Sequence, residues 1–248
     1  MKHIWKAIRR KFGPHRHSVL LAALIAAFSI RAFIGNSGAG PSVFSVVMVV
    51  LLLVALYNIN VDELIGDRGR LLVQRKRRRV LGWTLAAAAG FERVSLIFDH
   101  SRRLVLVGSI SWLLFVLFVT VSELRSVLKQ REITGETICM AISCYLLLGL
   151  NWAFLYIIIF QLHTAAFAGL AVANPGHPID IQPIFPVLGY FSLTTLSTIG
   201  FGDITPVTLQ ARYAAVAEGI TGQFYMAILV ARLVSLQMNR SISQRTEN

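Results

Sequence analysis

The segment Thr194-Thr195-Leu196-Ser197-Thr198-Ile199-Gly200-Phe201-Gly202-Asp203 lies in the last quarter of the chain, and its first four residues form the end of a short apolar stretch. That stretch, Val187 to Ser197, contains no proline. It is long enough for about three helical turns but too short to cross a bilayer. Before it, Ala173 to Pro186 contains four prolines, which are expected to exclude a continuous helix. The pattern predicts a short re-entrant helix followed by a non-helical segment.

The composition of the 248-residue chain indicates a lipid bilayer. Hydrophobic residues make up 55% of the chain and charged residues only 15%, which excludes a soluble domain and a disordered chain. Cys139 and Cys144 lie in one apolar stretch, which argues against a disulfide scaffold. Six stretches have the character of transmembrane helices. They are Val19 to Ile34, Pro41 to Tyr57, Val80 to Phe98, Leu104 to Val121, Ile138 to Leu162 and Tyr213 to Met238.

The basic residues predict the orientation of these six spans. Eighteen Lys and Arg residues fall in the two tails and in the second and fourth connections, against three in the other connections. Because basic residues favour the cytoplasmic side, both termini are predicted to be cytoplasmic, in a multi-pass protein of the cell membrane. The third span is the weakest, because Glu92 and Arg93 interrupt it. Without this span, however, the Arg75–Arg79 cluster and the Arg125–Arg131 loop would lie on opposite faces of the membrane. The third span is therefore kept in the prediction.

The opening segment resembles the selectivity filter of the tetrameric potassium channels. Where that family has threonines followed by Thr-Val-Gly-Tyr-Gly-Asp, this chain has Thr198-Ile199-Gly200-Phe201-Gly202-Asp203 after its own threonines. The specific match covers Pro186 to Pro206, and the order of helix, re-entrant loop and helix extends it from Ile138 to Met238. The resemblance implies an all-α membrane protein of six transmembrane helices, with a re-entrant pore helix and filter between the fifth and sixth. It also implies a potassium-selective channel, with K+ as the permeant ion and no cofactor.

The resemblance divides the chain into five parts. They are a basic cytoplasmic tail at 1–18, a four-helix membrane domain at 19–121, a cytoplasmic linker at 122–137, a pore domain at 138–238 and a cytoplasmic tail at 239–248. The four-helix domain resembles a voltage sensor, whose fourth span carries several regularly spaced arginines. Here that span has Arg102 and Arg103 at its outer end and no further base until Arg125. Steep voltage gating is therefore not expected.

The resemblance assigns the filter to Thr198, Ile199, Gly200, Phe201 and Gly202. The carbonyls of the first four residues would bind K+, and the Thr198 hydroxyl would add the innermost ligands. Successive carbonyls can all face one axis only if the backbone alternates between ordinary and left-handed conformations, and Gly200 and Gly202 tolerate positive φ. Ile199 would pack outward behind the filter. Phe201 stands where the family more often has Tyr, and it lacks the hydroxyl that could hydrogen-bond to the helix behind the filter.

The residues around the filter have an expected role and a simpler alternative. Asp203 would form a carboxylate ring that concentrates cations at the outer mouth, or would cap the following turn. Glu218, an acid inside an apolar span, would support the filter or the pore helix, with proton sensing or a tolerated site near the interface as alternatives. The other support residues are Thr194, Thr195 and Ser197, together with Tyr190 and Phe191, which would pack around the filter or belong to an ordinary aromatic core.

The last span is expected to be the inner, pore-lining helix. By the resemblance, Gly222 would be a hinge, and close helix packing is the alternative. Gln223, Met226, Val230 and Val234 follow one another at spacings of three and four, so they share one helical face. That face would line the inner cavity, or would contact lipid or another helix.

The expected partners follow from the filter and the charge. One chain supplies one filter strand and a closed ring of carbonyls needs four, which predicts a homotetramer. The cluster Arg75, Lys76, Arg77, Arg78 and Arg79 would bind anionic lipid, although orientation signalling alone would explain it equally well. The formal net charge of +12 does not indicate nucleic-acid binding, since no nucleic-acid motif accompanies the bases.

The sequence carries no enzyme signature. His163 and His177 lack metal-ligand spacing, and no nucleophile elbow or phosphate loop occurs. Two other functions stay open beside the potassium channel. They are a non-conducting or regulatory membrane subunit, and a less selective cation channel or transporter.

Overall fold

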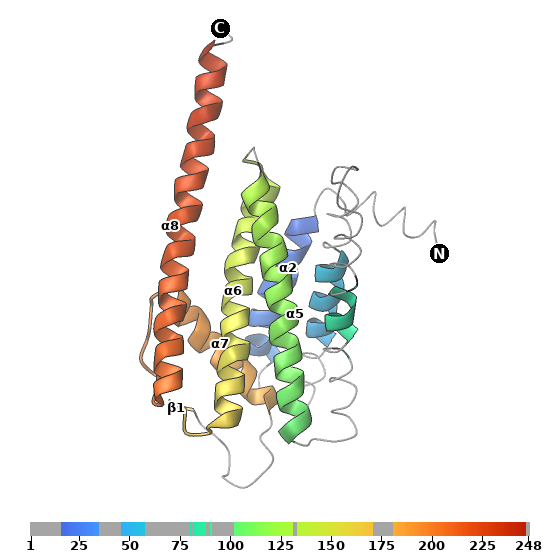
Figure 1. Cartoon of the computed structure of the whole chain (residues 1–248), viewed down its shortest axis with the longest axis vertical. Helices are drawn as coiled ribbons and strands as arrows, with labels where there is room; N and C mark the ends of the chain where they lie inside the picture. Colours follow the sequence, from blue (N-terminus) through green and yellow to red (C-terminus); the bar gives the residue numbers. More distant parts are fainter. Residues whose placement is uncertain are drawn as a thin grey trace, which may run out of the picture.

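The computed structural model describes residues 16–34, 46–57, 80, 82–87, 90, 102–130, 133–170 and 181–246. Its elements are the helices α2 (Arg16–Ile34), α5 (Arg102–Lys129), α6 (Gly135–Leu162), α7 (Ile181–Leu196) and α8 (Leu209–Thr246), and the strands β1 (Phe167–Ala168) and β2 (Thr205–Pro206) (Figure 1). A further apolar helix covers Val46–Tyr57. The described residues are mostly helical, in agreement with the prediction of an all-α membrane protein.

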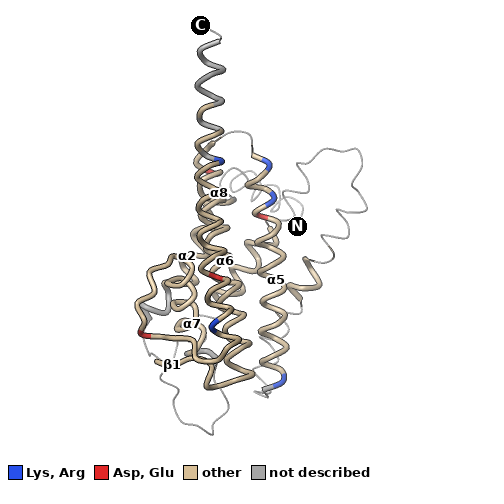
Figure 2. Tube along the Cα trace, turned by 60° about the vertical axis from the view of Figure 1, so that its left-hand side comes forward, with Lys and Arg blue, Asp and Glu red and all other residues tan. Residues whose placement is uncertain are grey.

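Three described helices are long and apolar enough to cross a membrane, and they correspond to the predicted fourth, fifth and sixth spans. They are Arg103–Lys129 in α5, Gly135–Leu162 in α6 and Leu209–Arg232 in α8. Lys and Arg lie near the two ends of α5 and leave its middle uncharged (Figure 2). Such helices are those of a multi-pass membrane protein.

The predicted first three spans are described only in part. Shorter apolar helices, His17–Ser29 and Val46–Tyr57, overlap the first and second. Most of the predicted third span, Val80 to Phe98, lies outside the described residues, as does the basic cluster at 75–79.

Two helices continue beyond the ends that the sequence predicts. The predicted cytoplasmic linker at 122–137 is mostly helical, because α5 continues to Lys129 and α6 already begins at Gly135. Thr134 caps α6, since its hydroxyl accepts from the Thr137 N–H at 3.3 Å, and the Thr137 hydroxyl accepts from the Thr134 N–H at 3.4 Å. The predicted tail at 239–248 is helical up to Thr246, and α8 extends well beyond the other labelled helices (Figure 1). The apolar pattern ends at the membrane surface, but a helix can continue beyond it. Its end depends on capping residues and on polar residues that favour a helix.

Helix α6 lies at the centre of the described helices, packed against α5, α2, α7 and α8. Trp112 of α5 stacks on Phe154 of α6, with ring centroids 5.9 Å apart. Two buried polar pairs also join these helices. The Asn151 amide donates to Thr120 Oγ1 at 2.7 Å, and the Gln161 amide donates to Ser109 Oγ at 2.8 Å. Hydrogen-bonded polar pairs inside an apolar interface fix one register, because any other register would leave them unsatisfied.

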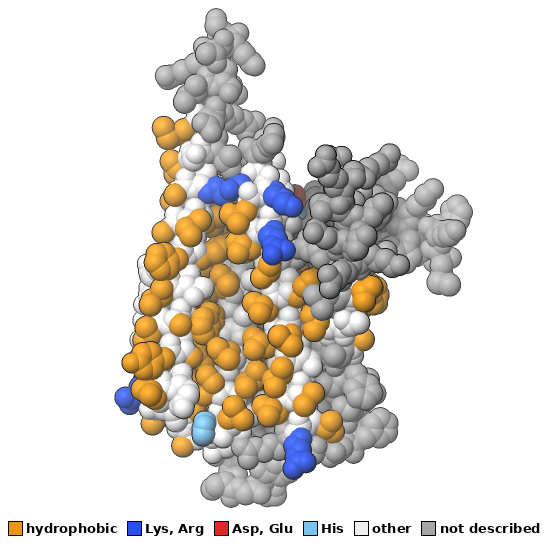
Figure 3. All heavy atoms as spheres, in the orientation of Figure 1, with side chains coloured by type: hydrophobic (Ala, Val, Ile, Leu, Met, Phe, Trp, Pro, Cys, Tyr) orange, Lys and Arg blue, Asp and Glu red, His pale blue; other side chains and the backbone are white. Residues whose placement is uncertain are grey.

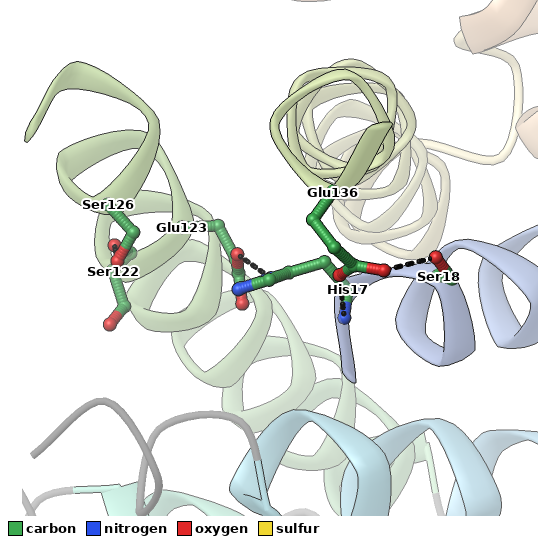
Figure 4. A network of polar contacts seen from close by, with 6 residues as sticks. All are labelled: His17, Ser18, Ser122, Glu123, Ser126 and Glu136. Carbon is green, nitrogen blue, oxygen red and sulfur yellow. Dashed lines mark hydrogen bonds and ion pairs between the residues drawn. The ribbon is translucent and has the colours of Figure 1, made fainter. Parts of the chain in front are cut away.

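A network of polar side chains joins α2 to the end of α5 and the start of α6 (Figure 4). Ser18 Oγ donates to one Glu136 carboxylate oxygen at 2.6 Å, and the His17 N–H donates to the other at 3.2 Å. His17 Nδ1 lies 3.2 Å from a Glu123 carboxylate oxygen. We call His17, Ser18, Glu123 and Glu136 the terminal network. It attaches α2 to the bundle at the end remote from α7 (Figure 1).

Candidate functional site

Helix α7 is the short helix that the sequence predicts, but it begins earlier than expected. It runs from Ile181 to Leu196 and contains Pro186, so the expectation that the prolines up to Pro186 exclude a helix is wrong for its last part. Pro183 falls in the first turn, where backbone N–H groups have no partner within the helix. Pro186 lies further along the helix and removes one backbone hydrogen bond, because proline has no N–H to donate. Helix α7 lies beside α6 and α8, which is the arrangement of a short helix between two spans (Figure 1).

The chain leaves α7 through hydrogen bonds to the carbonyls of its last turn. The Thr194 carbonyl accepts from the N–H groups of Ile199 at 2.9 Å and Gly200 at 3.1 Å. The Thr195 carbonyl accepts from the Thr198 N–H at 3.0 Å. The hydroxyls of Thr194 and Ser197 both turn back to α7, donating to the carbonyls of Phe191 and Leu193 at 3.0 and 2.7 Å. Residues 198–200 are therefore held directly by the end of α7.

The backbone of residues 198–202 alternates in sign of φ. Thr198, Gly200 and Gly202 have φ of 59°, 51° and 80°, whereas Ile199 and Phe201 between them are not in the positive-φ region. Alternation is the condition for successive carbonyls to face one side. The sequence predicts positive φ at the two glycines, and the structure has it there. It does not predict the third position, because Thr198 is β-branched and such residues rarely have positive φ.

The side chains in this segment are largely uncovered in one chain. Ile199 is 59% and Phe201 69% exposed. A Cβ added at Gly200 or Gly202 would meet no atom within 4 Å. The Phe201 ring stacks on Tyr190 of α7, with centroids 6.2 Å apart and planes 3° from parallel.

The far end of the segment is held by the connection after α6. Strand β2 pairs antiparallel with β1, and Val207 N–H donates to the Ala166 carbonyl at 2.8 Å. A Cβ at Gly169, where φ is 82°, would lie 1.9 Å from the Asp203 carbonyl oxygen, so only glycine fits there. The Asp203 carboxylate accepts from the Ile204 N–H at 3.0 Å. Desolvation and a hydrogen bond to Asp203 raise the pKa of Tyr190 above its usual value.

Glu218 joins three helices behind the segment. It is fully buried, and its two carboxylate oxygens contact the hydroxyls of Tyr156 in α6 and Ser192 in α7, the latter at 2.5 Å. Ser192 Oγ also lies 2.7 Å from the Gly149 carbonyl oxygen of α6. The sequence indicates Glu218 as a candidate but not its partners, which are 62 and 26 positions away and look like ordinary helix residues. We call Glu218, Tyr156, Ser192 and Gly149 the three-helix junction.

The next turn of α8 is in close contact with the end of α7. A Cβ at Gly222 would lie 2.2 Å from the Leu196 carbonyl oxygen, so the two backbones touch there. The adjacent Gln223 amide lies 3.5 Å from Thr198 Oγ1. Met226, Val230 and Val234 are exposed on α8. Gly222 therefore lies at a point of close helix packing, and its role as a hinge stays a prediction.

Phe191 lies in a buried aromatic group rather than beside Phe201. Its ring packs edge-on against Tyr156 and Phe167, with centroids 5.0 and 5.4 Å away. Tyr190 and Phe191, neighbours in the sequence, thus contact different parts of the structure. Within the part of the chain that the structure describes, no group of three or more His, Cys, Asp or Glu side chains could hold a metal ion.

Comparison with known proteins gives two matches. A protein family described as "Ion channel" matches residues 184–239, which include most of α7, the alternating segment and most of α8. Protein LctB of Bacillus caldotenax is 28% identical over 124 residues, covering 48% of this chain and 87% of that protein. No solved structure matches the chain. The family match supports an ion channel, and with it a membrane protein that is not an enzyme.

Proposed function

We propose that the chain is one subunit of a potassium-selective channel, in which four copies bring residues 198–202 around a common axis. The alternating φ of these residues, anchored to the last turn of α7, is the observation that supports this most. Potassium ions that lose their water need oxygen ligands in its place, and rings of backbone carbonyls supply them. The carbonyls of Thr198, Ile199, Gly200 and Phe201 would form these rings, with the Thr198 hydroxyl at the inner end.

The surroundings of the segment suit a cation pathway. The C-terminal end of α7 carries a partial negative charge of about half an electron charge, directed toward the start of the filter. Asp203 places a carboxylate beyond its other end. Gln223, Met226, Val230 and Val234 would line the inner cavity below it. No cofactor is needed, since the permeant K+ is the only ion that the site must bind.

Helix α8 has the exposed apolar surface that a homotetramer would bury. Only 11% of its spanning window is buried in one chain, against 56% for α6. Hydrophobic side chains cover much of the face seen in Figure 3. Exposed residues on α8 include Tyr213, Val216, Ile220, Phe224 and Ile228. In a tetramer this surface would face neighbouring subunits. Both termini would be cytoplasmic, and the cluster at 75–79 would contact anionic lipid headgroups there.

Ion selectivity tests the proposal directly. The full chain, purified and reconstituted in liposomes, should pass K+ and Rb+ far better than Na+, and Ba2+ should block the flux. Ion-substitution recordings measure the permeability ratio. Equal permeability to Na+ and K+ would instead support the less selective cation channel, and protein that forms tetramers without any flux would support the non-conducting subunit.

The open probability should change only gradually with voltage. Moving one charge through 100 mV is worth about 2.3 kcal/mol, so a steep response needs several charges per subunit. Helix α5 carries Arg102 and Arg103 at its start and no further base before Arg125. Single-channel recordings over a range of potentials measure this dependence. A curve with several gating charges per subunit would contradict the prediction.

A further inference from the structure

The three-helix junction raises a question of proton count. Tyr156 has one hydroxyl proton, and it reaches one oxygen of Glu218. Ser192 also has one, but two acceptors lie within hydrogen-bond distance of its Oγ: the Gly149 carbonyl at 2.7 Å and the other Glu218 oxygen at 2.5 Å. An ionised Glu218 offers no proton, so one of these two contacts would lack a hydrogen.

A proton on Glu218 removes this shortage. The carboxylic acid donates to Ser192 Oγ, Ser192 donates to the Gly149 carbonyl, and Tyr156 donates to the second Glu218 oxygen. Every contact then has its own proton. Among the described residues no Lys, Arg or His forms an ion pair with Glu218, and a buried carboxylate without a cation is more stable when neutral.

The junction is connected to the filter through the last turn of α7. Ser192 and Leu196 are one turn apart on α7, and Glu218 and Gly222 are one turn apart on α8. The two helices therefore meet at two successive turns. Ser192 is hydrogen-bonded to Glu218, and the backbone of Leu196 contacts that of Gly222. Between Ser192 and Leu196 lies Thr194, whose carbonyl holds the N–H groups of Ile199 and Gly200.

We propose that Glu218 is a positioning residue for the filter, held as a neutral carboxylic acid between Tyr156 and Ser192, so that α8 fixes the end of α7 and thereby residues 198–200. The inference rests on the proposed function for its effect on conduction. Its structural part, the coupling of Glu218 to the segment, stands independently of any ion flux.

The test compares Glu218→Gln with Glu218→Ala in the full chain. Glutamine reproduces the neutral acid, because its amide N–H can donate to Ser192 while its carbonyl accepts from Tyr156. Alanine removes both contacts. Glu136→Ala is the matched control. Glu136 also accepts two hydrogen bonds, but it lies at the start of α6 and belongs to the terminal network (Figure 4).

Hydrogen exchange of the reconstituted protein measures the coupling without requiring conduction. The amides of Ile199 and Gly200 should exchange about tenfold faster in Glu218→Ala, which is the change expected for the loss of a hydrogen bond to a buried group. Glu218→Gln and Glu136→Ala should exchange there as the original protein does. If Glu218→Ala does not assemble, two other variants should show the same direction of change. Tyr156→Phe removes one contact to Glu218, and Ser192→Ala removes the contacts to Glu218 and to the Gly149 carbonyl.

Single-channel recordings measure the consequence for conduction. Glu218→Ala should increase brief closures about tenfold, and raised external K+ should suppress them, since ions in the filter oppose its distortion. Glu218→Gln and Glu136→Ala should keep the original closures. Unchanged exchange in Glu218→Ala would overturn the positioning role, and a Glu218→Gln variant as impaired as Glu218→Ala would overturn the neutral acid. If the original protein passes no K+, the proposed function fails while hydrogen exchange still decides the coupling.

Discussion

Replacing Gly200 with alanine should abolish the potassium current while tetramers still form. Gly200 has φ of 51°, and an added Cβ would meet no atom within 4 Å, so the cost comes from the backbone alone. That cost is roughly 1–2 kcal/mol for each chain. In a fourfold ring it applies four times, and relaxation to negative φ would interrupt the alternation and turn carbonyls away from the axis. Flux from liposomes measures the effect.

Gly219→Ala is the matched control for this substitution. Gly219 lies in α8, and a Cβ there would meet only the Thr195 carbonyl oxygen, at an ordinary 3.9 Å. Because alanine favours a helix over glycine by about 1 kcal/mol, the control should conduct and be at least as stable. Size-exclusion chromatography of both variants separates lost conduction from lost assembly. A Gly200→Ala channel with the original current would contradict the filter assignment.

Mixing original subunits with Gly202→Asp subunits should reduce the current far more than in proportion. Gly202 has φ of 80° and lies at the end of the segment, where an aspartate in one chain would disturb the shared ring. With equal random mixing, roughly one sixteenth of tetramers contain only original subunits, an estimate that follows from fourfold symmetry.

Co-expression at equal levels, followed by flux measurement, checks this result. Mixtures with Gly219→Ala subunits should keep the full current. A Gly202→Asp mixture that retains half of the current would indicate a pore within each chain. Native mass measurement of a conducting monomer or dimer would likewise contradict the tetramer.

The sequence predicts those parts of the site that depend on local chemistry. Gly200 and Gly202 are predicted to have positive φ because glycine lacks a Cβ, and a short helix is predicted from the brief apolar stretch before them. The same local reasoning fails at Thr198, whose side chain argues against the conformation that it adopts. There the hydrogen bond from its N–H to Thr195 and the bonds from the next two N–H groups to Thr194 determine the backbone.

Contacts between distant residues were not predictable from a single sequence. Glu218 stands out as an acid in an apolar span, but nothing in the sequence singles out Tyr156 or Ser192 as its partners. The sequence predicts C-terminal ends of α5 and α8 that are too early, because the apolar pattern stops where the membrane does. It predicts a start of α7 that is too late, because prolines argue against a helix interior but are compatible with a helix N-terminus.

The strand pair β1–β2 bears on how subunits would come together. It ties the residues after Asp203 to the loop after α6 of the same chain, while the end of α7 holds residues 198–200. In the proposed tetramer, each subunit would therefore arrive with residues 198–202 already shaped. Ordering a backbone costs about 1–2 kcal/mol per residue, and this entropy is spent when the monomer folds rather than when copies associate. In the proposed tetramer, association would then lose less entropy, because the partners are already ordered where they meet.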